Sequence, residues 1–297
     1  MTRRDILIAT VVAAVWGLNF VVIEVGLREL PPLLFAALRF TLVACPAVFL
    51  VGRPQVPARL VVLIGLFLGV GQFGLLFVGM DLGVPAGLAS LVLQCQAMFT
   101  LAFAAAVIHE RPTPRQLAGC AVAFAGIALI ATGRAAGVSL AGLLLCIAAA
   151  ASWGASNVTT RIARPPDALA LLVWASLVPP LPLAALSLTF EGPHAIGDAF
   201  AGVGPAGIFA LLYVVLGATL FGFGTWTALL RRHPAGVVAP FSLLVPVFGL
   251  LSAALLLGEQ PNTAELAGAL VVLAGLVLTN LPARRSAGRA EPALARA

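Results

Sequence analysis

Charged residues are scarce in this chain, and lysine is absent. Of the 297 residues, 9% are charged, and all 17 basic residues are Arg. A soluble domain carries about 25% charged residues, so a soluble protein of this length could not cover its surface with so few. Hydrophobic residues make up 61%. This composition excludes a disordered chain, a coiled coil and a disulfide scaffold, and it indicates a polytopic membrane protein.

Cysteine is sparse as well. The four residues stand singly in apolar runs, at Cys45, Cys95, Cys120 and Cys146. They form no CxxC pair and no Cys/His cluster, so neither a metal site nor a disulfide is indicated. We expect small buried hydrophobic side chains there, and neither a metal nor a cofactor.

Long apolar runs fill most of the chain. A membrane-spanning helix needs about 20 mainly apolar residues. Pro, Gly and charged residues divide the chain into ten such segments, at 6–27, 32–51, 59–80, 84–108, 114–132, 138–160, 167–189, 206–230, 235–257 and 263–281. The connections between them are short, so the sequence predicts an all-α integral membrane protein with ten transmembrane helices.

The positions of the Arg residues predict the orientation. With the N-terminus in the cytoplasm and ten spans, 14 of the 17 Arg residues fall on the cytoplasmic side. This excess follows the positive-inside rule for a chain with both termini inside. The net charge of +6 is therefore an orientation signal in a lipid bilayer, and no nucleic-acid partner is expected.

The two halves of the chain resemble each other. Residues 85–129 align without gaps on 234–278, with 16 identities in 45 positions. The matched positions include Pro85 with Pro234, Glu110 with Glu259, Gly119 with Gly268, and Gly126 with Gly275. Such a gapless register of Pro, Glu and Gly indicates an internal repeat.

The repeat predicts the architecture. We assign residues 1–136 to a first five-helix repeat, 137–281 to a second, and 282–297 to a cytoplasmic, Arg-rich, disordered tail. Five is an odd number, so the second repeat is inverted in the membrane relative to the first. Inverted repeats are typical of secondary transporters, with the substrate site near the midplane between the halves.

Four stretches also carry a resemblance to a known family. They are Trp16-Gly17-Leu18-Asn19-Phe20, Pro31 to Phe40, Pro85 to Gln96, and Ser242 to Glu259. They resemble the EamA-type transporters of the drug/metabolite transporter superfamily, and especially the bacterial exporters of O-acetylserine and cysteine. The resemblance covers nearly the whole chain. It implies ten spans with both termini inside, a place in the bacterial inner membrane, and export of small metabolites without ATP.

Arg39 is the charge that lies deepest in a predicted span. It stands about eight residues into 32–51, between Leu38 and Phe40, and the corresponding region of the second repeat, Leu172 to Trp174, has no charge. A guanidinium can bind a substrate carboxylate bidentately. It can also be a structural group that donates to backbone carbonyls, and both interpretations stay open.

Several polar side chains in the fourth span have no polar counterpart in the second repeat, and Gln72 stands among glycines in the third span. Gln94 and Gln96 fall on Leu243 and Val245, and Ser90 falls on Ala239. Scaffold residues should recur in both halves, whereas an asymmetric ligand needs groups that do not. We therefore predict Ser90, Gln94 and Gln96, with Gln72, as substrate-binding residues; interhelical hydrogen bonding is the alternative. Ser90 and Gln94 are four residues apart and should share a helix face.

Two Trp–Asn pairs recur in the repeats. Trp16 and Asn19 are three residues apart, Trp153 and Asn157 are four apart, and each pair should lie on one helix face. The rings could stack on a substrate or attract an ammonium group, and the amides could hydrogen-bond it. Packing beside glycine, or a position in the interfacial aromatic belt, is the alternative. Trp174, Tyr213 and Trp226 are interpreted as packing or membrane-interface residues.

Two further groups affect the mechanism. Glu24 can pair with Arg28 four residues on, so we interpret it as peripheral, although it leaves proton coupling open. Pro240 and Pro246 interrupt the ninth span, and they are predicted either as a hinge or as a fixed kink.

The sequence therefore favours an inner-membrane exporter of zwitterionic, amino-acid-like metabolites that works by alternating access. No carboxylate lies at mid-membrane, as a cationic drug would favour. A broader drug or metabolite exporter is the alternative. An intramembrane enzyme or a channel is disfavoured because no GxGD, HExxH, GxSG, P-loop or filter-like motif is present.

Overall fold

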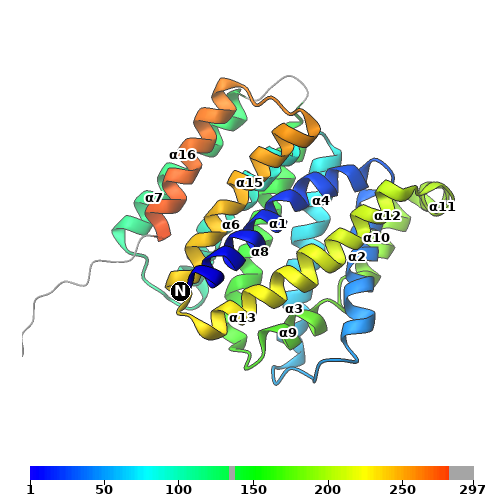
Figure 1. Ribbon diagram of the computed structural model, residues 1–297, viewed down its shortest axis with the longest axis horizontal. Coiled ribbons are helices and arrows are strands. Elements are labelled where there is room, and N and C mark those ends of the chain that lie inside the picture. The colour runs from blue at the N-terminus through cyan, green and yellow to red at the C-terminus, as the bar shows by residue number, and fades with distance from the viewer. Residues whose placement is uncertain (134–137, 281–297) are drawn as a thin grey trace, which may run out of the picture.

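The structure is a computed structural model that describes residues 1–133 and 138–280. The regular elements of this part of the chain are all helices (Figure 1). The boundary between the predicted repeats at 136/137 and the predicted tail at 282–297 lie outside the described residues.

Twenty helical elements follow one another. The first half contains α1 (Arg3–Leu27), α2 (Pro32–Ala47), α3 (Ala58–Gly65), η1 (Leu66–Gly74), α4 (Leu75–Asp81), α5 (Ala86–Leu93), α6 (Gln96–Val107) and α7 (Pro114–Gly133). The second half contains α8 (Leu140–Ala163), α9 (Ala168–Ala175), α10 (Pro180–Phe190), α11 (Gly192–Gly202), α12 (Pro205–Leu212), η2 (Tyr213–Phe223), α13 (Gly224–Arg232), α14 (Ala235–Val238), η3 (Ala239–Leu244), α15 (Val245–Ser252), η4 (Ala253–Leu257) and α16 (Thr263–Asn280).

Eight helical segments of the described chain are long and apolar enough to cross a bilayer. Two more apolar helices, Pro32–Ala47 and Thr263–Thr279, are shorter than the length that a span needs. The all-helical, multi-span class is confirmed, while the count of ten spans stays a prediction.

The seventh predicted span differs from expectation in two ways. It is divided into α9 and α10, because Pro179 and Pro180 lack the N–H groups that would continue the helix. The additional helix α11 follows directly, and Gly192 turns the chain into it with a positive φ of 85°. Only glycine adopts such a φ without steric cost.

The third predicted span of each half, at 59–80 and 206–230, contains a stretch of π-helix. These wide turns are η1, between α3 and α4, and η2, between α12 and α13. A π-helical turn shifts the register of the helix and frequently marks a functional site. The matching positions of η1 and η2 agree with the internal repeat.

Two glycines let helices from opposite halves approach closely. A Cβ on Gly17 of α1 would lie 2.8 Å from the carbonyl oxygen of Val245 in α15, close to Phe248. A Cβ on Gly154 of α8 would lie 2.8 Å from Cβ of Phe99 in α6. Phe248 stands 149 residues after Phe99, so the two crossings are equivalent under the repeat. The first helix of each half therefore packs against the other half.

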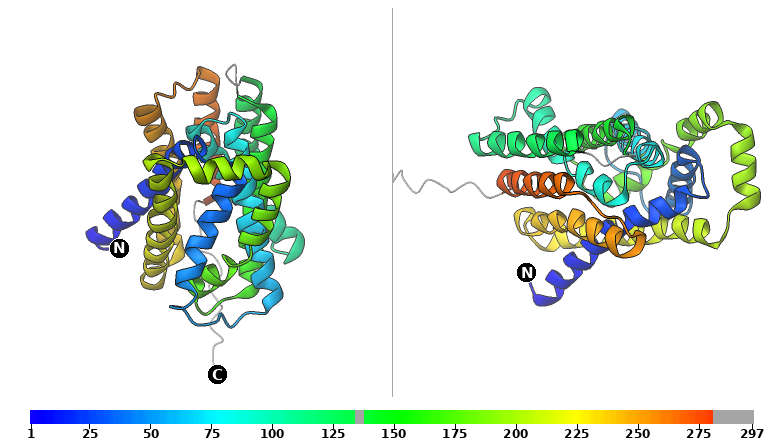
Figure 2. Two further views of the ribbon diagram at one scale, coloured as in Figure 1. Left: turned by 90° about the vertical axis from the view of Figure 1, so that its right-hand side faces the viewer. Right: turned by 90° about the horizontal axis from the view of Figure 1, so that it is seen from above.

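The last helices of the two halves form a pair at one side of the bundle. Helices α7 and α16 lie side by side (Figures 1 and 2). Gly126 packs on Gly268, and Gly119 on Gly275, so the helices are antiparallel and the contacts exchange under the repeat. Close helix–helix packing through small residues is characteristic of membrane proteins.

A carboxylate from the second half caps the start of α5. Glu259 accepts the backbone N–H groups of Ala86, at 2.8 Å, and Gly87, at 3.1 Å. Glu24 also accepts from Ala86, at 3.2 Å, and lies 3.7 Å from Arg28 as predicted. Negative charge is favourable at a helix N-terminus. Because Glu24 belongs to α1 and Glu259 follows η4, these contacts also join the two halves.

Two other helices that begin at this end are capped in the same way. Glu191 accepts from Leu33 and Leu34 in the first turn of α2, and Glu29 accepts from Gly207 in the first turn of α12. Each carboxylate is distant in sequence from the helix it caps. The caps therefore tie separate helices together as well as satisfying free N–H groups.

Gly17→Ala should destabilise the protein by about 1–3 kcal/mol, because the added methyl group meets the backbone of α15. Gly197→Ala in α11 is the matched control, since nothing lies within 4 Å of its Cβ position. Thermal denaturation in detergent should show a lower midpoint for the first variant and an unchanged or higher one for the second. Equal shifts would contradict the packing argument.

Glu259→Ala should lower the stability by about 1–2 kcal/mol, because Gly87 loses its acceptor and Ala86 keeps Glu24 alone. Asp198→Ala, at an exposed position of α11, is the control carboxylate. The measurement is again thermal denaturation, and a midpoint for Glu259→Ala that matches the control would exclude a stabilising cap.

Candidate functional site

A cavity of about 340 Å³ lies between the two halves. Its volume is within the range of about 300–1,000 Å³ that is typical of small-molecule sites. The predicted residues that line it are Trp16, Asn19, Arg39, Gln72, Gln94, Gln96, Trp153 and Asn157. One predicted residue, Ser90, does not. The structure thus brings together side chains from five separate helical elements and from the break between α5 and α6.

Helices α1 and α8 contribute equivalent pairs to this cavity. Trp16 and Asn19 line it from α1, and Trp153 and Asn157 line it from α8. The expectation that each pair shares one helix face is confirmed. Because both pairs recur in the repeat, they form a lining that is close to symmetric.

Two broken helices supply a second equivalent pair of walls. The α-helix is interrupted after Leu93, and α6 begins at Gln96; in the other half, η3 has 3₁₀ geometry and α15 begins at Val245. Val245 stands 149 residues after Gln96, so the two breaks coincide in the repeat. Broken helices at mid-membrane are typical of transporter binding sites, where the irregular backbone lines a cavity.

Pro240 and Pro246 flank this second break, as expected for an interruption. Pro240 lies in η3 and is exposed, whereas Pro246 lies in the first turn of α15 and is buried. Proline removes the N–H donor that a regular helix would use. The break itself is established, and hinge motion about it stays a prediction.

Arg39 is the charged residue of the described lining, and the corresponding region of the second half has no charge. Its side chain is 2% exposed. The Nη2 group donates to the hydroxyl of Thr219 at 3.0 Å, and the guanidinium carbon lies 3.7 Å from the ring centroid of Phe73. Such a cation–π contact is worth about 2 kcal/mol when it is desolvated. Within the described residues, no carboxylate forms an ion pair with Arg39.

Four polar atoms of this cavity lie buried without a hydrogen-bond partner in the described structure. Two are donors, Nε and Nη1 of Arg39, and two are acceptors, Oδ1 of Asn19 and Oε1 of Gln72. An unsatisfied buried polar atom costs about 1–3 kcal/mol, and more when the group is charged. Unpaired donors and acceptors together in one cavity favour a ligand that carries both kinds of polar group.

Other polar groups of the lining are already engaged. Nδ2 of Asn157 donates to Oε1 of Gln96 at 2.7 Å and to Thr100 at 3.1 Å. Nε1 of Trp16 donates at 2.9 Å to the carbonyl of Ala218 in η2. These contacts support the alternative that the sequence left open, in which part of the predicted set joins helices to one another.

Ser90 lies outside the cavity, and its hydroxyl donates to the carbonyl of Gly87 at 2.7 Å. The side chain packs against Gly249, where it fills the space beside the α15 backbone. Gln94 lines the cavity and Ser90 does not, because α5 ends at Leu93 and Gln94 lies in the break that follows. The geometry gives Ser90 a packing contact.

Several lining residues were missed or interpreted otherwise. Trp226 and Phe223, three residues apart, line the cavity and face Trp16 at centroid distances of 5.2 and 5.1 Å. The interpretation of Trp226 as a packing residue alone was therefore incomplete, and the i, i+3 spacing of two aromatic residues was the available signal. The packing interpretation of Tyr213 is confirmed, since its hydroxyl donates to the carbonyl of Val15.

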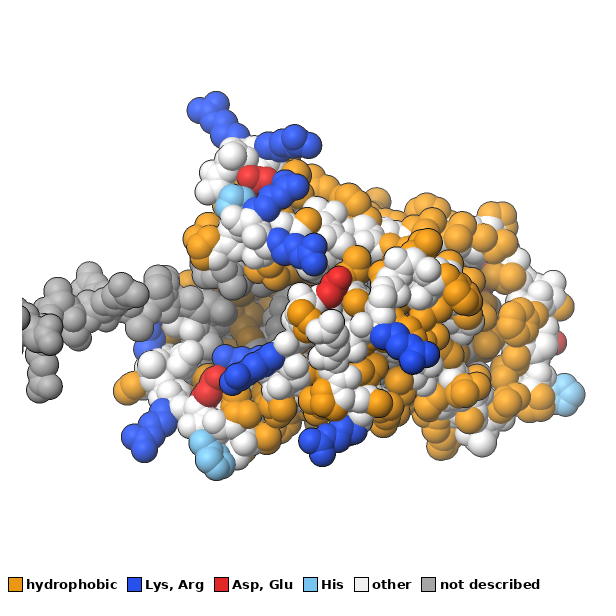
Figure 3. Space-filling view, turned by 90° about the horizontal axis from the view of Figure 1, so that it is seen from below, with side chains coloured by type: hydrophobic (Ala, Val, Ile, Leu, Met, Phe, Trp, Pro, Cys, Tyr) orange, Lys and Arg blue, Asp and Glu red, His pale blue; other side chains and the backbone are white. Residues whose placement is uncertain are grey.

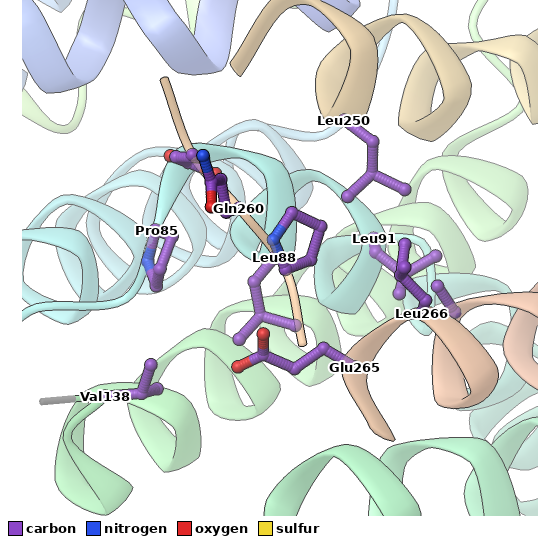
Figure 4. Close-up of a pocket in the computed structure, with 11 residues that line it drawn as sticks. Pro85, Leu88, Leu91, Val138, Leu250, Gln260, Glu265 and Leu266 are labelled. Carbon is purple, nitrogen blue, oxygen red and sulfur yellow. The ribbon is translucent and has the colours of Figure 1, made fainter. Parts of the chain in front are cut away.

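A second cavity, of about 250 Å³, lies near the start of α5 (Figure 4). Leu88, Leu91, Leu250 and Leu266 surround it. Of its carboxylates, Glu259 caps α5, and Oε2 of Glu265 accepts from the backbone of Asn262. Its carboxylates thus serve helix ends, so it is less suited to a polar ligand than the central cavity.

Arg side chains gather at one end of the bundle, around a recess in the face of Figure 3. All described Arg residues except Arg28 and Arg39 lie at or next to helix termini, or in a connecting loop, at this arginine-rich end. Asn157 and Trp226 lie in α8 and α13, whose C-terminal ends point there, and each is six residues before the last residue of its helix. The central cavity therefore reaches from mid-bundle toward the arginine-rich end.

Comparisons with known proteins agree with this architecture. The model of the EamA-like transporter family matches residues 3–132 and, a second time, residues 140–281. One solved crystal structure covers 96% of this chain, and all of its own chain is covered, with a TM-score of 0.63 and 23% identity. At that identity the likeness shows the fold alone.

Curated relatives are more similar in sequence. A probable amino-acid metabolite efflux pump of Salmonella typhimurium is 46% identical over 284 residues, which are 94% of this chain and 95% of the relative. Its counterpart in Escherichia coli is 42% identical over the same shares. A probable terminal-alkyne amino-acid exporter of Streptantibioticus cattleyicolor is 30% identical and covers 74% of this chain and 72% of its own. With a duplicated family domain and a multi-span helical fold, this chain is a membrane transporter rather than an enzyme, and it belongs to the EamA-like transporter family.

Proposed function

We propose that this protein exports amino-acid-like metabolites, of the cysteine and O-acetylserine type, across a bacterial inner membrane by alternating access. The proposal includes ten spans with both termini in the cytoplasm, so that the arginine-rich end faces the cytoplasm. The positive-inside rule and the inner-membrane transporter of Escherichia coli among the relatives support this orientation.

The observation that carries the proposal is the unpaired guanidinium of Arg39. An Arg at the centre of a spanning helix costs about 2.5–3.5 kcal/mol on insertion scales, and more if it lacks a partner. Thr219 and Phe73 offset part of this cost, but two N–H donors stay unsatisfied in the described structure. A substrate carboxylate that enters the cavity can accept from one of these donors in a charge-assisted hydrogen bond and neutralise the guanidinium.

The cavity lining also bears on the alternative, a drug exporter. A permanently cationic drug would favour a carboxylate beside it, and no Asp or Glu is among the described lining residues. Arg39 would repel such a cation. The printed names of the similar relatives, amino-acid metabolite efflux pumps and an amino-acid exporter, favour a substrate with a carboxylate.

Polar contacts between the halves at both ends support alternating access. At the arginine-rich end, Glu110 pairs with Arg161 at 2.9 Å, and Asp5 lies 3.0 Å from Nε2 of His233. At the other end, Glu259 holds α5. To open toward one side, the protein must separate the contacts at that end while the contacts at the opposite end persist. Rocking of two halves around a central site has this requirement.

A proton route remains part of the proposal to be tested. Burial raises the pKa of Glu259, and the nearby charge of Glu24 adds to the rise. This carboxyl therefore takes up a proton at milder acidity than an ordinary Glu, at a contact between the halves. The central cavity itself has no described carboxylate to carry one.

Purified protein in proteoliposomes should exchange radiolabelled cysteine and O-acetylserine, while cationic drugs neither move nor compete. The assay is counterflow, with and without an imposed proton gradient, and empty liposomes are the control. Movement of a cationic drug without movement of either zwitterion would contradict the proposed substrate class. An unchanged rate under a gradient would exclude proton coupling.

Arg39→Gln should reduce transport of these metabolites by about 10–100-fold, the equivalent of the 1.5–3 kcal/mol that a hydrogen bond to a charged group contributes. Arg39→Lys should retain an intermediate rate because it keeps the charge without the planar pair of donors. Arg28→Gln is the matched control, since Arg28 is exposed and far from the cavity lining. Full transport with unchanged KM in Arg39→Gln would remove Arg39 from the site.

A further inference from the structure

We propose that the amide oxygens of Asn19 and Gln72 form a subsite for the α-ammonium group of the substrate. Arg39 takes the carboxylate, so the cavity recognises both poles of a zwitterion and rejects N-acylated or deaminated acids. This inference rests on the proposed function and adds to it which atoms distinguish an amino acid from another small carboxylic acid.

The two oxygens are suited to this task by burial and by lack of a partner. Asn19 is 7% exposed and Gln72 is 2% exposed, and both line the central cavity. Neither Oδ1 of Asn19 nor Oε1 of Gln72 accepts a hydrogen bond in the described structure. An ammonium group has three donors and no acceptor, so it is complementary to unpaired oxygens.

The donors and acceptors come from different elements. Asn19 belongs to α1, Gln72 to η1 and Arg39 to α2. A carboxylate only accepts hydrogen bonds and an ammonium only donates them, so one zwitterion can engage the guanidinium with one end and the two amide oxygens with the other. An anion without an amine would leave both oxygens buried and unsatisfied, at about 1–3 kcal/mol each.

The amide pair also explains why a carboxylate is absent from this lining. An Asp or Glu at either position would bind an ammonium more strongly, but it would share the cavity with Arg39. The two opposite charges would attract each other in a low-dielectric site and neutralise the carboxylate-binding group. Neutral oxygens can accept from an ammonium while the guanidinium stays available.

Other amides in the cavity provide an internal comparison. Oε1 of Gln96 already accepts from Asn157 at 2.7 Å, so Gln96 has less to offer an ammonium. Its substitution therefore changes the same cavity without removing an unpaired oxygen.

The test compares two isomers of equal size, O-acetylserine and N-acetylserine, of which the first alone carries an ammonium group. Each competes against a labelled substrate in counterflow by the purified wild-type protein, and the ratio of their inhibition constants is measured. Loss of two hydrogen bonds to a charged group predicts at least about 10-fold weaker inhibition by N-acetylserine. Equal inhibition by the two isomers in the wild type would overturn the subsite.

The variants Gln72→Met and Asn19→Leu keep the side-chain volume but remove the oxygens. In each, the ratio should fall by about 10-fold toward one, whereas Gln96→Met should keep the wild-type ratio whatever its overall rate. A ratio that stays at the wild-type value in Gln72→Met and Asn19→Leu would mean that the amides do not contact the ammonium. Failure of both isomers and of cysteine to compete in the wild type would instead refute the proposed function.

Discussion

A guanidinium group lies buried at the centre of this helical bundle, with a threonine hydroxyl and an aromatic ring as its contacts and no carboxylate beside it in the described structure. The low dielectric of a membrane interior makes such a charge costly, so the residues around it must either supply compensation or leave room for a ligand that does. Helices from both halves leave that room. Arg39 lacks a carboxylate partner in the described structure, and the proposed substrate is one that supplies a carboxylate.

The position of this charge depends on the repeat. Equivalent glycine crossings, equivalent helix breaks and π-helical turns in the third helix of each half surround one cavity with walls that nearly match. Two matching halves can rock about a common site, which is the physical basis of alternating access. A symmetric cavity cannot, however, orient a molecule with two different ends. Arg39, with no counterpart in the second half, breaks that symmetry.

Much of this arrangement could be predicted because charge, hydropathy and the gapless repeat act along the sequence. Helix positions, the Arg-bearing end and most of the polar side chains of the cavity lining follow from them. Ser90 was included because it falls on Ala239 in the repeat, but its hydroxyl donates to the carbonyl of Gly87 and its side chain packs beside Gly249, outside the cavity. Trp226 and Phe223 were not assigned to the site because their i, i+3 spacing suits helix packing as well as a cavity lining; the contact with Trp16 places them in the lining. Such contacts join residues far apart in sequence.

The most direct measurement of the central claim is the ratio of the binding affinities of cysteine and its methyl ester, determined for the wild type and for Arg39→Gln. If the substrate carboxylate neutralises Arg39, the wild type should bind the ester at least about 10-fold more weakly, and the ratio should fall toward one in the variant. A wild-type protein that binds the ester as tightly as the free acid, or an Arg39→Gln variant that keeps the full ratio, would contradict the account.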